Sequence, residues 1–329
     1  MNELLKVSII IPTYNRIDDL KKCLNSIFLQ IYKPSEIIIV DDSTSEIVEE
    51  YIHIQKEKWL SKKVELIYIK NSYGKSLTKA RNIGIDVASG NILCFLDDDV
   101  ILNENYIFEI VSFFMQNPKT IGAQGYVTNT YVPKFYIELC NKIFMLNHLE
   151  KNKCRVLRSS HLTYPKECPD KPISCEWLSG CNHAYRKTVF NEFRYDEKLI
   201  EYSLKEDADL SYRVNKKYPN QLRLIPSAKC VHNVSSAGRM PKISSLYMEY
   251  GYLSYFFYKN VNRNIIESIC FKWSMVGKIL KNILEILIRS NSKQQDFCRY
   301  LKAIIDIRKY IEDIKDENIL EFGKSVKKL

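Results

Sequence analysis

The first hundred residues alternate between short apolar runs and segments in which apolar residues recur every three or four positions. The runs have the length of buried strands and lie at Val7–Ile11, Glu36–Val40, Val64–Ile69 and Ile92–Leu96. The segments between them predict helices, the first capped by Asp18 and the others at Thr44–Leu60 and Leu77–Ala88. Strands that are apolar throughout and alternate with helices predict an α/β fold with a mostly parallel sheet covered on both faces.

The middle of the chain has a weaker pattern. A helix is expected at Glu104–Gln116, and three prolines make residues 151–174 resemble a long mobile loop, of the kind that often covers a site. Residues 203–216 predict a helix that begins with a capping box formed by Ser203 and Glu206. Two short final strands are expected at Leu222–Ile225 and Cys230–His232.

The chain beyond Arg239 has a helical pattern with one broad apolar face. This face consists of Ile265, Ile266, Ile269, Trp273, Val276, Ile279, Leu280, Ile283, Leu284 and Leu287. It is accompanied by Lys272, Lys278, Lys281 and Arg289. A basic, amphipathic helix can lie on an anionic membrane, but a dimer interface or packing against the rest of the chain explains the same pattern.

Composition narrows the class of protein. No apolar stretch approaches the roughly 20 residues that a membrane span needs, and we expect no secretory signal at the start of the chain. We therefore expect a cytoplasmic protein, and any membrane contact would be peripheral, on the cytoplasmic face. In that compartment the ten cysteines need not form disulfides. Cys175, Cys181 and His183 could ligate a metal, but buried thiols are the simpler interpretation.

Charge and polar clusters add more specific information. The net charge is +10, and residues 231–329 hold 17 Lys or Arg against 10 Asp or Glu, so the basic excess is carboxy-terminal. Polar clusters follow three of the predicted strands, at residues 14–16, 41–42 and 97–99. Ligands of open α/β sheets bind beyond the carboxyl ends of the strands, and crowded carboxylates there suit Mn²⁺ or Mg²⁺ with a diphosphate.

Seven motifs in one order make the chain resemble a known family. They are VSIIIPTYNR, EIIIVDDSTS, ARNIG, FLDDDV, WLSGCN, KEDADLSYR and VHN. In this order and approximate spacing they resemble the inverting glycosyltransferases of family 2, over about residues 6–239. The resemblance implies a GT-A fold, which is a mostly parallel mixed sheet flanked by helices, here followed by a helical C-terminal extension.

The resemblance also implies a donor site and a metal site, with a bound Mn²⁺ or Mg²⁺. It places Pro12, Tyr14 and Asp42 around the base of the nucleotide, and we add Arg16 from the same polar cluster. Further candidates for the nucleotide, its diphosphate or its ribose are Arg81, Asp97 and Asp98. The Asp-Asp-Asp cluster stands where the family has its DXD motif, and Asp99 and His232 are the expected metal ligands.

The general base and the acceptor side follow from the later motifs. Asp207 resembles the family's general base, and its expected place in the first turn of a helix favours the ionised carboxylate that a base needs. Trp177, Gly180 and Glu206 are candidates for acceptor binding. Trp177 could stack on a sugar ring, although it could equally belong to the core.

These expectations divide the chain into three parts. Residues 1–100 would bind the donor, residues 101–238 would bind the acceptor and carry catalysis, and residues 239–329 would contact a membrane surface or another subunit. The resulting hypothesis is a hexosyl- or N-acetylhexosaminyltransferase. It would move a sugar from a nucleoside diphosphate, most often UDP in this family, onto a glycan or lipid-linked glycan hydroxyl, in polysaccharide or protein-glycan synthesis.

Three alternatives compete with this hypothesis. A nucleotidyltransferase or a dinucleotide-dependent dehydrogenase would need a glycine-rich loop after Ile11, where the chain has Pro-Thr-Tyr-Asn-Arg. A non-catalytic sugar-nucleotide-binding or scaffolding protein would not need Asp99, Asp207 and His232 together. Nucleic acid is not an expected partner, because the basic helices carry no recognition motif.

Overall fold

The computed structural model describes residues 5–235, 242–289 and 293–327, which form two compact units. Unit 1 comprises Met1–Thr130, Cys168–Glu197 and Glu206–Arg239. Unit 2 comprises Tyr131–Glu167, Lys198–Lys205 and Met240–Leu329. The expected division at residues 100 and 238 concerns which ligand each part binds, and it stays a prediction. The boundaries of the compact units differ from this division, because residues 131–167 belong to the same unit as the C-terminal helices.

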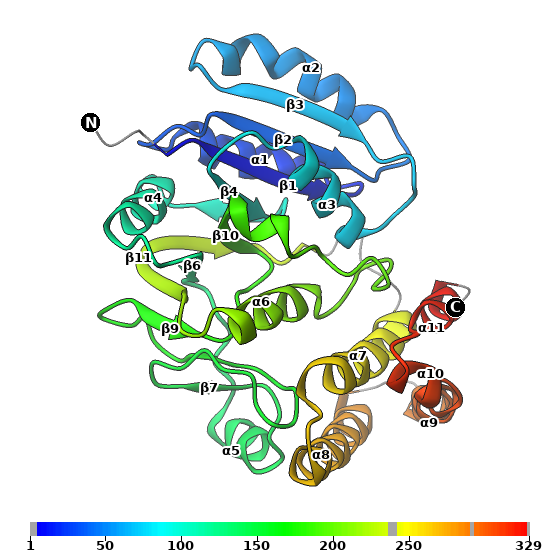
Figure 1. Ribbon diagram of the computed structural model, residues 1–329. Helices are drawn as coiled ribbons and strands as arrows, with labels where there is room; N and C mark the ends of the chain where they lie inside the picture. Colours follow the sequence, from blue (N-terminus) through cyan, green and yellow to red (C-terminus); the bar gives the residue numbers. More distant parts are fainter. Residues whose placement is uncertain (1–4, 236–241, 290–292, 328–329) are drawn as a thin grey trace. The chain divides into compact units, whose positions relative to one another are not determined.

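Unit 1 is an α/β unit with one central sheet (Figure 1). Its elements in chain order are β1 (Val7–Thr13), α1 (Ile17–Phe28), β2 (Glu36–Asp41), α2 (Ile47–Leu60), β3 (Glu65–Lys70), α3 (Leu77–Val87), β4 (Ile92–Leu96), β5 (Val100–Leu102), α4 (Tyr106–Gln116), β6 (Gly122–Val127), β9 (Ile173–Cys175), β10 (Asn182–Arg186), a 3-10 helix (Lys187–Asn191), α6 (Glu206–Lys217) and β11 (Leu222–His232). The expected α/β architecture is confirmed.

The sheet is mixed. Among the described residues it has nine strands in the order β3-β2-β1-β4-β10-β6-β11-β5, with β9 paired to β11 beside them. The four strands of the amino-terminal part are parallel, with Ile9 opposite Ile37 on one side and Cys94 on the other. Strand β10 is antiparallel to both of its neighbours, β4 and β6. The parallel half therefore presents the carboxyl ends of β1, β2 and β4 at one edge.

Both faces of the parallel half are covered, which explains why every residue of β1 is buried. Ile9 and Ile11 face a core that also contains the apolar sides of α1, α2 and α4. Ile10 faces the opposite way, toward α3, and a Cβ on Gly84 would lie 2.4 Å from its side chain. Gly84 therefore permits the close approach of α3 to the sheet that the motif containing Arg81 requires.

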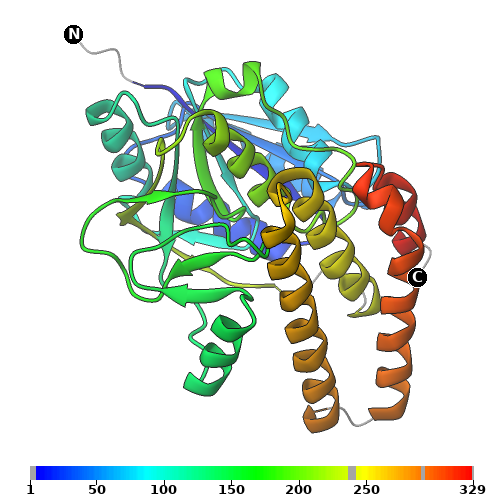
Figure 2. The ribbon, with the colours of Figure 1, turned by 60° about the horizontal axis from the view of Figure 1, so that its bottom comes forward.

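Unit 2 is mainly helical (Figure 2). Its elements are α5 (Phe135–Ile143), β7 (His148–Glu150), β8 (Thr163–Pro165), α7 (Lys242–Phe256), a π-helical turn (Phe257–Val261), α8 (Ile265–Arg289), α9 (Lys293–Lys309), α10 (Ile311–Lys315) and α11 (Leu320–Lys327). Its core is rich in tyrosine, and the hydroxyls of Tyr250 and Tyr300 lie 2.6 Å apart within it. A Cβ on Gly251 would lie 2.1 Å from the Phe322 ring, so this glycine lets α11 pack tightly on α7.

Some local expectations were wrong. The long loop at residues 151–174 contains β8 and the start of β9. The two final strands are one strand, β11, whose register shifts between Ile225 and Lys229. Asp18 lies inside the first turn of α1, since the residue at the cap is Arg16.

The C-terminal helices have no segment long and apolar enough to cross a bilayer among the described residues.

The capping box at residues 203–206 is also absent. The Ser203 hydroxyl donates to the carbonyls of Leu199 and Glu201, and the helix begins at Glu206. The Glu206 carboxylate instead accepts a hydrogen bond from Arg81, 125 positions earlier in the chain. A long-range charge partner has replaced the local backbone partner that the sequence pattern suggested.

Candidate active site

The candidate site lies at the carboxyl ends of β1, β2 and β4. Thr13 ends β1, Asp41 ends β2, and residues 97–99 follow β4 directly. Because the three strands are adjacent and parallel, their ends bring the three polar clusters to one edge of the sheet. Every candidate residue predicted from the sequence belongs to unit 1.

Asp98 is held by the end of β1 and the turn after it. Its carboxylate accepts hydrogen bonds from the Thr13 hydroxyl at 2.8 Å and from Arg16 Nη1 at 3.2 Å. Burial raises the pKa of Asp98 to about 7, although Arg16 and Thr13 act in the opposite direction. Arg16, a predicted nucleotide ligand, also lies 3.6 Å from Asp99. The Asp98 carboxylate thus anchors the turn at residues 97–99 to β1.

Asp97, Asp99 and His232 form the group of described residues that could hold a metal ion. One ligand atom from each lies within 4.8 Å of the others. Asp99 Oδ1 lies 3.0 Å from His232 Nε2, yet this buried oxygen accepts no hydrogen bond of good geometry from the described residues. Two carboxylates and an imidazole suit Mn²⁺ or Mg²⁺, so these residues fit the expected ion. Asp97, predicted to meet the ribose, joins this group.

The other Asp99 oxygen has a backbone partner, since Asp99 Oδ2 accepts a hydrogen bond from the Ser235 amide at 3.0 Å. Burial would raise the pKa of Asp99, but His232 and Ser235 lower it below its usual value. The alternative group of Cys175, Cys181 and His183 is not assembled as a metal site among the described residues. The two ring nitrogens of His183 are instead hydrogen-bonded to the Ser179 carbonyl and the Tyr195 hydroxyl.

Asp42 lies at the end of β2 in a small polar frame. Its two oxygens accept hydrogen bonds from the Asn71 side-chain amide at 2.6 Å and from the Ser76 backbone at 2.8 Å. Burial raises the pKa of Asp42 to about 6, against the effect of these two donors. The half-buried Tyr14 directly follows β1, and Lys75 Nζ lies 4.2 Å from the centroid of its ring. Pro12 is buried within β1.

Arg81 of α3 is the most buried cation of the site, with 1% of its surface exposed. Its Nη1 donates to Glu206 at 2.6 Å, and its Nη2 donates to Asp97 and to the Gly180 carbonyl, each at 3.0 Å. Burial would lower the pKa of Arg81, but Tyr195, Glu206 and Asp97 raise it above its usual value. A guanidinium so enclosed would act on a donor indirectly, by positioning Asp97.

Asp207 is held by peptide groups at the start of α6. Its Oδ2 accepts a hydrogen bond from the Gly180 amide, and its Oδ1 accepts one from the Ala208 amide, each at 2.7 Å. It is half-buried, so it can be reached from solvent. A carboxylate has about four acceptor positions, so two bonds leave room for a substrate hydroxyl.

Gly180 connects this carboxylate to Arg81. Its amide donates to Asp207 while its carbonyl accepts from Arg81, so the two peptide groups on either side of one Cα join the two residues. A Cβ at this position would lie 3.1 Å from Glu206 Oε1 and 3.2 Å from Asp207 Oδ2. Any larger residue would therefore crowd both carboxylates.

The other two acceptor-side candidates are buried. Glu206 is enclosed beside Arg81, and burial raises its pKa to about 8, although Arg81 lowers it. Trp177 is 8% exposed, which leaves little ring surface for stacking on a sugar. In this structure both residues support the site from within, and their direct contact with an acceptor stays a prediction.

Several supporting residues were missed in the sequence. Asn71 follows β3 as Asp42 follows β2, so the same strand-end argument would have found it. Thr13 ends β1 and could have been found in the same way. Tyr195, whose ring centroid lies 5.3 Å from the Arg81 guanidinium, and Ser235 stand in segments without a motif or a regular pattern.

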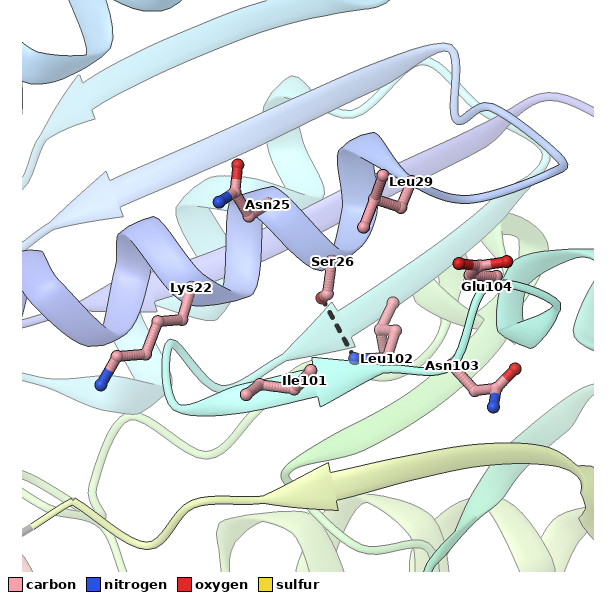
Figure 3. A pocket seen from close by; sticks show the side chains of 8 residues that line it. All are labelled: Lys22, Asn25, Ser26, Leu29, Ile101, Leu102, Asn103 and Glu104. Carbon is pink, nitrogen blue, oxygen red and sulfur yellow. Dashed lines mark hydrogen bonds between the residues drawn. The ribbon is translucent and has the colours of Figure 1, made fainter.

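A separate hollow of about 480 Å³ lies between α1 and the β5 segment (Figure 3). It is lined by Lys22, Asn25, Ser26, Leu29, Ile101, Leu102, Asn103 and Glu104. Across it the Leu102 amide donates to the Ser26 hydroxyl at 3.1 Å. It shares no lining residue with the candidate site, and its few charged groups sit on an open surface, so we assign it no role in the chemistry.

Comparison with known proteins gives a family match and several relatives. The family model described as glycosyl transferase family 2 matches residues 8–194, which is more than half of the chain. The glycosyltransferase GlyA of Streptococcus pneumoniae serotype 4 is 26% identical over 196 residues, covering 58% of this chain and 26% of GlyA. The match thus spans about a quarter of that relative's length.

Two solved structures illustrate the similarity of fold. Staphylococcus aureus TarS, residues 1–349, in complex with UDP-GlcNAc aligns with a TM-score of 0.57 at 15% identity, covering 98% of this chain and 91% of that one. The mannosyltransferase PcManGT from Pyrobaculum calidifontis, in complex with GDP-Man and Mn²⁺, aligns with a TM-score of 0.56 at 13% identity, covering 97% and 86%. The expected GT-A fold is confirmed.

Proposed function

Because the chain belongs to glycosyltransferase family 2, we propose that it transfers a sugar from a nucleoside diphosphate sugar to an acceptor hydroxyl, with inversion at the anomeric carbon. The observation that carries the proposal is the setting of Asp207. Two peptide amides at the start of α6 orient its carboxylate, and its side chain is partly exposed. It shares unit 1 with the carboxylate–imidazole group that could hold a metal.

Asp207 would act as the general base of a single displacement. Its carboxylate would accept the proton of the acceptor hydroxyl while that oxygen forms the bond to the anomeric carbon. The bond between the anomeric carbon and the diphosphate oxygen breaks at the same time, and the nucleoside diphosphate leaves on the opposite face. Gly180 contributes by fixing the direction in which the carboxylate points.

The donor would be bound at the strand ends. Asp97, Asp99 and His232 would hold Mn²⁺ or Mg²⁺, an ion that neutralises charge on a leaving diphosphate. Pro12, Tyr14, Arg16, Asp42 and Asp98 would surround the nucleoside, Asp42 and Asp98 from their fixed positions. TarS binds UDP-GlcNAc and PcManGT binds GDP-Man in the same fold. We propose a UDP-sugar, the donor that the family uses most often.

The acceptor we propose is a hydroxyl of a glycan or lipid-linked glycan. A competing function is that of a non-catalytic sugar-nucleotide-binding protein. It is disfavoured because such a protein has no use for an Asp207 carboxylate oriented by two peptide amides beside a tightly packed Gly180.

The test is a panel of UDP-, GDP- and dTDP-sugars, with nucleotide release measured with and without Mn²⁺. Asp207→Asn should lower turnover by about a thousandfold while the Kd for the donor stays within about twofold. Asp313→Asn, an exposed aspartate in the first turn of α10, is the matched control and should leave turnover unchanged. Donor binding without metal-dependent turnover in the unaltered protein would establish the binding-protein alternative.

A further inference from the structure

The largest accumulation of exposed apolar side chains is in unit 2, on α5, the segment before it and α8. Large apolar residues that are exposed here include Phe135 at 82% and Ile265 at 74%. The full set is Tyr131, Val132, Phe135, Tyr136, Leu139 and Ile143 from the first segment and Ile265, Ile266, Ile269, Trp273, Val276, Leu280, Leu284 and Leu287 from α8. We call this set the apolar platform.

The part on α8 is a continuous stripe. Its residues recur every three or four positions from Ile265 to Leu287, which is the spacing of one helix face, over about 33 Å. The adjacent side of α8 is already used, because Met275, Ile279 and Ile283 pack against the tyrosine-rich core of unit 2. The outward face of a packed helix is ordinarily polar, so the exposed stripe needs another explanation.

Contacts inside unit 2 fix α5 against α8. Trp273 Nε1 donates to the Ile143 carbonyl at 2.8 Å, and the Trp273 and Phe144 rings stack with centroids 4.9 Å apart. Lys281 Nζ lies 3.4 Å from Asn141 Oδ1, and a Cβ on Gly277 would lie 2.2 Å from Phe144. The two sets of exposed residues are therefore held together as one surface.

The exposed charged side chains described around the platform are all basic. Among the described side chains of residues 131–143 and 262–287, the exposed charged ones are Lys134, Lys142, Arg263 and Lys272. The two partly buried acids there are engaged by backbone amides, Glu138 by Leu149 and Glu267 by Asn264.

From these observations we propose that the apolar platform docks on an anionic lipid membrane surface. Tyrosine, tryptophan and phenylalanine with flanking lysines are the side chains that enter the interfacial region of a bilayer, and the cations match anionic headgroups. A second copy of the chain fits less well, because a self-complementary interface would bring like-charged lysines together. The inference does not depend on the proposed transfer chemistry, although it would bring the enzyme to a lipid-linked acceptor.

The experiment is co-sedimentation of the full chain with phosphatidylcholine vesicles that contain either no anionic lipid or about 30% phosphatidylglycerol. We expect binding to the anionic vesicles, weakened by salt. Leu280→Glu/Leu284→Glu should weaken it by at least about tenfold. Ile54→Glu/Leu60→Glu, at exposed apolar positions of α2, is the matched control and should bind as the unaltered chain does.

Trp273 supplies a second readout. It is 45% exposed, whereas Trp59 and Trp177 are buried, so a blue shift of tryptophan fluorescence on adding anionic vesicles should disappear in Trp273→Phe. Lys142→Glu/Lys272→Glu should abolish the preference for anionic vesicles. Equal binding by the Leu280→Glu/Leu284→Glu variant, or no binding by the unaltered chain, would overturn the proposal.

Sedimentation equilibrium tests the competing occupant. A dimer that Leu280→Glu/Leu284→Glu converts to a monomer, without vesicle binding, would assign the platform to a second copy and overturn the membrane assignment. Nucleotide release from soluble donors, measured without vesicles, reports separately on the proposed function. Failure of the one proposal is therefore distinguishable from failure of the other.

Discussion

In unit 1 the interior contains Arg81, Asp98, Asp99 and Glu206, whereas in unit 2 the surface carries the apolar platform. Both arrangements depart from the usual rule that charged side chains are exposed and apolar side chains are buried. A buried charge is costly unless it is paired, so its presence in unit 1 marks residues kept for chemistry. A large exposed apolar surface is equally unusual, and its presence in unit 2 marks a place for another molecule. The comparison separates the proposed site of reaction from the proposed docking surface.

After the loss expected for Asp207→Asn, removing a proposed metal ligand should have the largest effect on unit 1. Asp99→Asn should weaken Mn²⁺ binding, measured by titration calorimetry, and lower metal-stimulated turnover by about a hundredfold. The neighbouring Asp98→Asn is the sharpest comparison, because its carboxylate is engaged by Thr13 and Arg16. It should leave Mn²⁺ affinity within about threefold. Equal losses of affinity in the two variants would show that residues 97–99 bind the ion without the distinction drawn here.

Replacing the buried cation should have the next largest effect. Arg81→Lys keeps a charge but cannot reach three acceptors at once, so we expect a loss of about 2 kcal/mol in the free energy of unfolding and about tenfold in kcat. If Arg81 positions Asp97 and Gly180, the donor KM should change little and the pH profile of kcat should shift. A rise in donor KM with unchanged kcat would show that it binds the nucleotide directly. Arg194→Lys, at a partly exposed ion pair, is the control.

Glu206 allows a test by pH. Burial raises its pKa to about 8, above the value of about 4.3 in an unfolded chain, so the folded state retains a proton that the unfolded state has lost. Stability should therefore be greatest below the unfolded pKa and decline as pH rises toward 8, by up to about 1.4 kcal/mol per pH unit. Urea denaturation at several pH values should show this decline relative to Glu206→Gln. A constant difference would mean that Arg81 keeps Glu206 ionised throughout.

The smallest effect on stability is expected at the platform. Leu280→Glu should change the free energy of unfolding by less than about 0.5 kcal/mol, because its side chain is already exposed. Leu253→Glu, at a buried position of the same unit, should cost more than about 3 kcal/mol. Denaturant titration of both variants would make the comparison. A large loss in Leu280→Glu would show that the platform is part of the folded core.

Much of unit 1 could be predicted from the sequence, because its signals are local. The apolar run at β4 has the observed bounds, and the strand-end argument brought Asp42 and residues 97–99 to one edge of the sheet. The errors arose where a distant residue intervened. Glu206 accepts a hydrogen bond from Arg81 and does not form the expected capping box. Strand β11 continues past Pro226, where a register shift interrupts the sequence pattern of a strand.

Unit 2 was predicted less well for a related reason. The stripe on α8 has a helical period and was recognised, but no helix was expected at α5, which carries its counterpart. The two helices belong to one surface only through contacts such as that between Trp273 and Ile143, which are 130 positions apart. Periodicity within a segment carries no information about such pairs.

The backbone of Gly180 has a further consequence for the energetics of the site. Its amide and its carbonyl belong to two successive peptide groups that meet at one Cα, and they are hydrogen-bonded to Asp207 and to Arg81 respectively. A displacement of this residue that follows one side chain therefore disturbs its hydrogen bond to the other. The two side chains are therefore thermodynamically coupled without touching each other. In a double-mutant cycle on kcat, Arg81→Lys should cost much less when Asp207 is already asparagine than in the unaltered chain. Substitutions at these three positions would be tolerated together more readily than one at a time.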